Sequence, residues 1–181
     1  MFSVDVLTTP AGAVAPVYLA ERLGVDASDP LLPGYIAAAT EAAGEYIRRA
    51  ITQRQLRVTF NEWPSFGAAG RWVSGSRARL GGFVELPYTG PIVSVDTVEG
   101  DDGAITGWQL VKGNPARLVM PPVIPLVVTY TTGWATPPAP ITEAVAMLAA
   151  FMYDHRGQCD AGDQITRSGA ASLLNPYRVD L

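Results

Sequence analysis

The chain has 181 residues, of which 48% are hydrophobic and 17% charged, a balance typical of one globular domain rather than of a disordered chain. Its net charge of −4 argues against stable nucleic-acid binding through phosphates, and its single cysteine, Cys159, excludes an internal disulfide or a cysteine-based zinc cluster. The first ten residues lack the basic start of a secretory signal, and the longest apolar run, 144–152, is too short to span a bilayer. We therefore expect a soluble protein made in a cytoplasm.

Two helices are predicted in the first fifty residues. The first covers Pro16 to Leu23, with proline at the first helical position and Gly24 at its end. The second runs from Asp29, expected as its N-cap, to about Ala50. Its apolar residues recur at spacings of three and four, as in a helix with one buried face. They are Leu32, Ile36, Ala39, Ala43, Ile47 and Ala50.

After Arg54 the hydrophobic period changes to two, which predicts strands. Leu56, Val58 and Phe60 alternate with polar residues, and the turn sequence at 101–103, Asp-Asp-Gly, indicates a hairpin. Because the segments are short and follow one another closely, we predict an antiparallel meander. The further strand candidates are 83–86, 92–98, 108–111, 116–119 and 126–131.

The segment 65–82 is rich in glycine, alanine and serine, and we expect it to be a mobile loop or an extended hairpin arm. It carries Arg71, Arg77 and Arg79, with Trp72 among them. Arginines beside an aromatic ring can contact nucleic acid, but the same residue types anchor protein interfaces. Because the chain is acidic overall, we favour a protein partner and take these four residues as interface candidates.

A long helix is predicted over 140–156, and its middle is apolar on almost all sides. Such a helix either sits at the centre of a small domain or lies against a neighbouring subunit. We assign Leu148 to the core, and at least one of Met147 and Phe151 to a subunit interface. A last short helix is expected over 168–174, before Asn-Pro.

The usual catalytic signatures are missing. There is no nucleophile elbow, phosphate-binding loop or zinc-protease motif, and the only histidine, His155, rules out a histidine-based triad or a three-histidine metal site within one subunit. His155 and Cys159 have a spacing that could share a metal, but Gly157 breaks the helix between them. We therefore favour His155 as a helix C-cap, where a partly cationic ring is stabilised.

Glu99, Asp101 and Asp102 form a small acidic cluster. Such carboxylates can bind a cation or act as a pair in acid–base chemistry. We favour a solvated β-turn, because the cluster coincides with the hairpin signal. The sequence therefore predicts no catalytic residue, no cofactor site and no metal site, and we expect a protein that is not an enzyme.

The order of the segments resembles the head–tail connector (adaptor, or head-completion) family of tailed bacteriophages, in particular its longer members with an elaborated β region. Residues 17–64 resemble the family's opening, in which a short helix, an acidic turn and an alanine-rich helix precede a strand that closes in Trp-Pro. VELPYTGPIVSVDTVEGDDGAITGWQL resembles the central strand pair, and VVTYTTGW the last strand. PAPITEAVAMLAAFMYDHRG and LLNPYRV resemble the long C-terminal helix and the closing segment, whose Tyr177 and Arg178 are further interface candidates. Nearly the whole chain is covered, but 65–82 is longer than the family pattern and has no fixed role in it.

The resemblance implies an α+β fold. A helical core, formed by the N-terminal helices and the long C-terminal helix, would carry an inserted antiparallel β meander. Residues 1–181 would form a single domain, with 1–53 and 138–181 as its helical part and 54–137 as its β part.

The resemblance also implies a structural virion protein, located in the neck between capsid and tail. A closed ring of about twelve copies would dock under the portal protein and offer a platform to a tail-terminator or the next neck protein. Double-stranded DNA would pass through the lumen without sequence-specific binding. An acidic subunit suits such a conduit, because a strongly basic lumen would hold DNA instead of letting it slide. No membrane partner is expected.

Two other functions stay open. One is a tail-terminator or tail-completion protein of similar size, and the other is a small enzyme that uses Glu99, Asp101 and Asp102. The position of the gene would separate the three, since a connector gene is expected directly after the portal, protease and major capsid genes.

Overall fold

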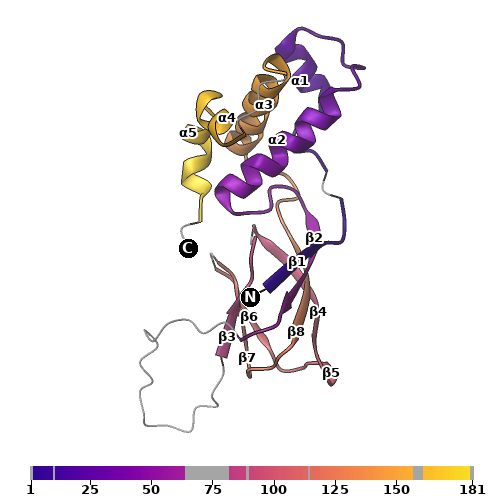
Figure 1. Cartoon of the computed structure of the whole chain (residues 1–181), viewed down its shortest axis with the longest axis vertical. Helices are drawn as coiled ribbons and strands as arrows, with labels where there is room; N and C mark the ends of the chain where they lie inside the picture. Colours follow the sequence, from indigo (N-terminus) through magenta and orange to yellow (C-terminus); the bar gives the residue numbers. More distant parts are fainter. Residues whose placement is uncertain are drawn as a thin grey trace. The chain divides into compact units, whose positions relative to one another are not determined.

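The computed structural model describes residues 2–9, 11–63, 82–88, 90–113, 115–156 and 161–179, with the side chains of the last range from 164 onward. The chain divides into two compact units (Figure 1). The helical unit comprises Thr9–Gln53 and Gly133–Leu181, and the β unit comprises Met1–Thr8 and Arg54–Thr132. The α+β class is confirmed. The first eight residues, expected in the helical part, belong to the β unit, and that the two units form a single domain stays a prediction.

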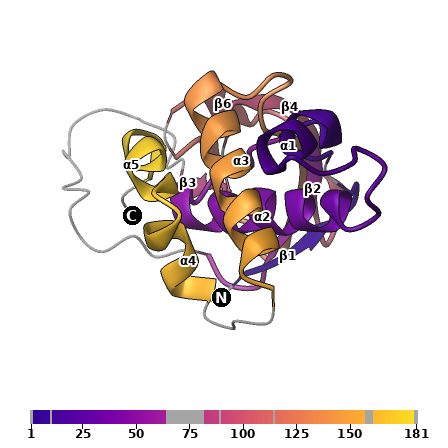
Figure 2. The ribbon, with the colours of Figure 1, turned by 90° about the horizontal axis from the view of Figure 1, so that it is seen from above.

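The helical unit is built around its longest C-terminal helix. Its helices are α1 (Pro16–Leu23), α2 (Leu32–Ile47), α3 (Ala139–Asp154), α4 (Ala161–Arg167) and α5 (Ala170–Leu174), followed by a 3₁₀ turn, η1 (Asn175–Tyr177). Helix α3 crosses α2 and also contacts α1, α4 and α5 (Figure 2). Its buried residues face several directions, which confirms its central position: Ile141, Ala144, Val145, Ala146, Leu148, Ala149 and Tyr153. In the described ranges, no helix combines the length and apolar character that crossing a membrane requires.

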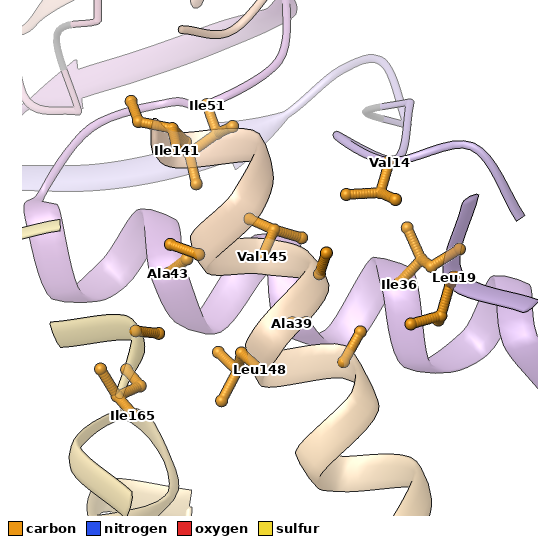
Figure 3. Close-up of a cluster of buried hydrophobic side chains, with 14 of the residues drawn as sticks. Val14, Leu19, Ile36, Ala39, Ala43, Ile51, Ile141, Val145, Leu148 and Ile165 are labelled. Carbon is orange, nitrogen blue, oxygen red and sulfur yellow. The ribbon is translucent and has the colours of Figure 1, made fainter. Parts of the chain in front are cut away.

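Small side chains on α2 allow α3 to pack closely against it. Ala39 and Ala43 are fully buried on α2, and Val145 and Leu148 are fully buried on α3. All four belong to one hydrophobic cluster, the helical core, which extends to Val14 before α1 and to α4 and α5 (Figure 3). Alanine at a helix crossing lets the two axes approach, since the distance between packed helices depends on the side chains at the contact.

Helix α2 is shorter than predicted at both ends. Asp29 is not its N-cap, because its Oδ1 instead accepts a hydrogen bond from the backbone of Leu31, at 2.9 Å, in the turn before the helix. Leu31 is the N-cap residue, and the first helical turn includes a proline, which lacks the N–H that would be unsatisfied there. The helix ends at Ile47 because Arg48 adopts a left-handed conformation, with φ of 57°.

The β unit consists of two antiparallel sheets. One has the order β1-β2-β8-β4-β5 and the other β3-β7-β6. The strands are β1 (Phe2–Val6), β2 (Arg54–Phe60), β3 (Gly82–Glu85), β4 (Ile92–Gly100), β5 (Gly103–Ala104), β6 (Gln109–Val111), β7 (Arg117–Met120) and β8 (Leu126–Thr132). The antiparallel pairing is as predicted, but the strands do not follow chain order as in a meander. Strand β8 has no exposed residue, and it lies in the middle of the larger sheet, where both of its neighbours help to bury it.

Both sheets contribute to a second hydrophobic cluster, the β core. From the larger sheet come Leu56, Val58 and Phe60 of β2, Ile92 and Val98 of β4, and alternate residues of β8. From the smaller sheet come Val84 of β3 and Leu118 and Met120 of β7. The phenol of Tyr130 is buried in this cluster and donates a hydrogen bond to the carbonyl of Pro87, and its burial raises the pKa of this tyrosine. Each unit thus has a core of its own.

Glycine is required at position 133, directly after β8. Its φ is 107°, and a Cβ there would lie 2.3 Å from the carbonyl oxygen of Thr52. The two segments stay together, because Trp134 donates a backbone hydrogen bond to Ile51 at 3.2 Å and forms a parallel bridge with Thr52. A side chain at this position would force two backbone segments apart.

We expect Gly133→Ala to lower the free energy of unfolding by roughly 3 kcal/mol, because backbone strain and overlap with Thr52 act together. The matched control is Gly24→Ala. Gly24 also has a positive φ, 67°, but nothing lies within 4 Å of its added Cβ, so the expected cost is about 1 kcal/mol. Urea denaturation of both variants measures the difference. Equal losses would show that the approach to Thr52 does not constrain the fold.

Candidate interaction surfaces

Part of the predicted interface lies outside the described residues. Arg71, Trp72, Arg77 and Arg79 all fall within 64–81, and Cys159 falls within 157–160. Their roles therefore stay predictions.

Met147 and Phe151 are half-buried on α3, whereas Leu148 between them is fully buried, as predicted. The ring of Phe151 stacks on that of His155, with centroids 4.0 Å apart, and the guanidinium of Arg167 lies 5.5 Å from the Phe151 centroid. The Cε of Met147 lies 3.1 Å from where a Cβ on Gly169 would be. Both side chains thus pack within the helical unit and keep an accessible part, and their role at a subunit interface stays a prediction.

His155 caps the C-terminus of α3, as the sequence indicated. Its backbone N–H donates to the carbonyl of Phe151 at 3.0 Å, and its Nδ1 lies 2.9 Å from the same oxygen. Both contacts are made to the same carbonyl oxygen, in the last turn of the helix. Among the residues with described side chains, no three metal-ligating groups come together.

The closing segment, with the candidates Tyr177 and Arg178, is attached to the end of α2. The guanidinium of Arg178 lies 5.3 Å from the ring centroid of Tyr46, and the Tyr46 hydroxyl donates to Asn175 Oδ1 at 2.7 Å. The backbone N–H of Val179 donates to the carbonyl of Ile47 at 3.1 Å. A cation at a helix C-terminus is favourable. Arg178 is exposed, and its role and that of Tyr177 at an interface stay predictions.

The acidic cluster lies at the turn between β4 and β5. Glu99 pairs with Ala104 in a short hairpin, and Gly103 has the positive φ that such a turn needs, 104°. The side chains of Glu99, Asp101 and Asp102 are exposed. The β-turn favoured from the sequence is therefore confirmed.

Two polar clasps join distant parts of the helical unit. Glu143 on α3 accepts a hydrogen bond from Tyr18 at 2.8 Å and a short hydrogen bond and ion pair from Arg22, both on α1. The hydrogen bonds from Arg22 and Tyr18 hold the pKa of the Glu143 carboxyl below its ordinary value. The partners are more than 120 residues apart, so no local pattern in the sequence could reveal this clasp.

The second clasp holds the turn before α2 against the end of α3. The hydroxyl of Tyr153 donates to Asp29 Oδ2 at 2.6 Å, and the guanidinium of Arg156 lies 4.2 Å from the Tyr153 ring centroid. The hydrogen bond from Tyr153, followed by that from the Leu31 backbone, holds the pKa of the Asp29 carboxyl below its ordinary value.

The clasps predict acid sensitivity. A carboxyl with a lowered folded-state pKa contributes stability above its unfolded pKa of about 4, and this contribution is lost as the pH falls through the folded pKa. We therefore expect the free energy of unfolding to decrease as the pH is lowered past about 4. Tyr153→Phe is expected to make this decrease smaller. Denaturation at a series of pH values, with Asp29→Asn as the second arm of a double-mutant cycle, measures this. If Tyr153→Phe still changed the pH dependence after Asp29→Asn, the clasp would not be its source.

The sequence interpretation missed an exposed apolar edge on the β unit. Strand β1 was not predicted, although its residues FSVDV alternate apolar and polar side chains. Phe2, Val6 and Leu7 are exposed there. Alternation over 2–6 was the signal that could have identified the strand.

The sequence matches no model of a known protein family, and no curated protein matches it. Solved structures do match over nearly the whole chain. The neck of the empty GTA particle, computed with C6 symmetry, contains a chain with a TM-score of 0.75 and 23% identity, the match covering 99% of this chain and 96% of that chain. A chain in the neck of the native GTA particle, computed with C12 symmetry, has a TM-score of 0.72 and 23% identity, and the match covers 99% of this chain and 96% of that chain. A chain in the virion of the native gene transfer agent (GTA) particle has a TM-score of 0.70 and 22% identity, and the match covers 98% of this chain and 96% of that chain.

At these identities the likeness concerns the fold. Both units are included, because the match covers all but a few residues of each chain. The likeness agrees, at the level of the fold, with the resemblance to head–tail connectors seen in the sequence.

Proposed function

We propose that this chain is a structural subunit of the neck of a tailed phage or phage-like particle, where several copies form a ring. The observation that carries the proposal is the end-to-end likeness to chains from GTA particles, two of them in neck structures, at TM-scores of 0.70 to 0.75. The C6 and C12 symmetries of the two neck structures support a ring of many copies rather than a dimer. The independent resemblance of the sequence segments to head–tail connectors supports the same function.

Within the neck, the proposed role is that of an adaptor. One face of the ring docks under the portal protein, and the other receives a tail-terminator or the next neck protein. The net charge of −4 supports a lumen through which DNA slides, since a strongly basic lumen would hold its phosphates. The candidates for these contacts are Arg71, Trp72, Arg77, Arg79, Met147, Phe151, Tyr177 and Arg178.

A tail-terminator or tail-completion protein is the second candidate, because such proteins are also ring-forming virion parts of similar size. The enzymatic alternative has less support. Its carboxylates, Glu99, Asp101 and Asp102, lie exposed on a hairpin turn, where water solvates them. Burial, which tunes carboxyl groups for acid–base work, is missing at this turn.

The proposal predicts different outcomes for neighbouring residues of α3. Leu148→Asp places a charge in the helical core and is expected to cost more than about 3 kcal/mol, so that the subunit unfolds. Phe151→Asp changes a half-buried residue and is expected to leave the circular dichroism spectrum intact while weakening ring formation. Met147→Asp serves as the parallel variant. If both half-exposed positions tolerated aspartate with unchanged ring assembly, α3 would lie outside the subunit interface.

The proposed function is tested in the particle. Deleting the gene is expected to give DNA-filled heads without tails, and a plasmid copy should restore tailed particles. Cryo-electron microscopy of the restored particles should place this chain between the portal and the tail. If the deletion strain makes free tails of normal length with normal ends, this chain acts on the head side. Frayed or overlong tails in that strain would indicate a tail-terminator. Normal particles without the gene would overturn the proposal.

A further inference from the structure

Strand β1 presents an unprotected edge. Its five residues pair with β2 in an unbroken register, from Phe2 opposite Phe60 to Val6 opposite Leu56. The backbone N–H of Leu7 donates to the carbonyl of Gln55 at 2.9 Å, so the N–H of the preceding residue, Val6, points away from β2. Within the described residues no strand pairs with that outer side. The strand has no lysine, proline or bulge, the usual means by which proteins block an open edge.

The apolar face of the sheet continues onto this edge. Phe2 and Val6 lie opposite Phe60 and Leu56, so they share the face that carries the β core. On β2 these positions are buried, whereas Phe2 is 51% exposed and Val6 52% exposed. The apolar face that is buried at β2 therefore continues onto β1, where it is exposed. A partner strand at this edge would bury both side chains.

The opposite side of the sheet, at β4, is only partly covered by the residues that the structure describes. Strand β5 pairs only with Glu99 and Gly100 of β4, and Ile105 extends this cover to the carbonyl of Val98 at 2.7 Å. The stretch 92–97 of β4 has no strand on its outer side within the described residues, and Val93 there is 51% exposed. Two register shifts against β8 lie in the same stretch. Bulges of this kind bend a sheet, as closure around an axis requires.

The strand directions fit one kind of assembly. Strands β1, β2, β8 and β4 alternate in direction, so β1 and β4 run opposite to each other. Rotation about a ring axis changes the direction of a strand by no more than the angle between neighbouring copies, which is small in a ring of many copies. Strand β1 of one copy, placed beside β4 of its neighbour, therefore meets it antiparallel, and the pattern of the sheet continues across the contact. Two different edges on opposite sides of a subunit are what a heterologous ring contact needs.

From these observations we propose that β1 of one copy pairs with the open stretch of β4 in the next copy. The larger sheets of all copies then join into one continuous antiparallel band around the ring. This inference rests on the proposed ring and deepens it by naming the contact. A two-fold pairing of β1 with β1 is the competing arrangement, and it would leave the β4 edge open in both copies.

Disulfide trapping in the full chain tests the contact. In a Cys159→Ser background, Ser3→Cys on β1 is combined in turn with Ser94→Cys and with Thr97→Cys on β4, because all three positions lie on the same face of the sheet. Within one copy β1 and β4 are three strand spacings apart, roughly 14 Å, beyond the roughly 7 Å that a disulfide can bridge. Any bond between them must therefore join two copies. The matched control combines Ser3→Cys with Glu21→Cys, an exposed position on α1.

Oxidation at high protein concentration is expected to give a ladder of covalent oligomers with one of the two β1–β4 pairs, and none with the control. Dimers alone, formed equally by Ser3→Cys without a second cysteine, would establish the two-fold pairing and overturn the proposal. Absence of a β1–β4 ladder would overturn it as well. If rings were nevertheless seen by mass or microscopy, the proposed function would stand without this contact. If the ladder formed but the protein were absent from particle necks, the contact would stand and the proposed function would fail.

A backbone variant separates edge pairing from side-chain loss. Val6→Pro removes an outward N–H and leaves the ladder to β2 intact, whereas Val6→Ala removes side-chain area and keeps the N–H. We expect both variants to melt within a few degrees of each other, and Val6→Pro to weaken assembly by roughly tenfold more than Val6→Ala. Native mass spectrometry across a concentration series measures this. Equal assembly by the two variants would show that the outward N–H makes no bond between copies.

Discussion

Helix α3 imposes the main constraint on the helical unit, because its apolar residues leave no side that can face water without cost. The consecutive residues Ala144, Val145 and Ala146 point in different directions around the helix and are all fully buried. One partner helix can cover only one stripe, so the unit needs α1, α2 and α5 around the same axis. The polar clasps follow from this arrangement. They lie at the two ends of α3, where Glu143 and Tyr153 reach residues of α1 and of the turn before α2.

The residues of the two units alternate along the chain. Each unit is assembled from two separate pieces, and the chain passes between units after Thr8, Gln53 and Thr132. The N-terminal piece of the β unit, β1, has no partner until β2 has been made nearly fifty residues later. Its own contacts are few, since four of its five residues are exposed. The strand is therefore held mainly by its backbone ladder and by the ring contact of Phe2 with Phe60, and four of its five side chains keep surface that another contact could cover.

The sequence predicted most clearly those elements whose burial is one-sided and periodic. Helix α1 and its glycine end were predicted to the residue, because Pro16 and Gly24 define both ends locally. Strand order was wrong, because a meander assumes that neighbours in the chain pair, whereas β8 lies between β2 and β4 through its near-complete burial. Helix α4 was missed, since seven residues with one large apolar side chain, Ile165, are too few to show a period. The clasp of Asp29 with Tyr153 depends on tertiary packing and has no local signature. Of the candidate interface residues, Met147, Phe151, Tyr177 and Arg178 could be located, and only the pattern at 2–6 could have added the β1 edge.

An open edge is normally a hazard, because it templates pairing with any available strand. For a ring subunit the same edge is useful only if some arrangement satisfies it completely. A two-fold dimer through β1 leaves two β4 edges open, and a linear row of copies leaves one edge open at each end. A closed ring leaves none, since the number of contacts equals the number of copies. The last copy to join therefore makes two contacts instead of one, which favours complete rings over partial ones. An edge that must bind cannot carry lysine or proline, and the absence of both from β1 fits this requirement. The exposed Asp5 and the net charge of −4 then oppose unspecific association by charge repulsion between copies rather than by blocking the strand.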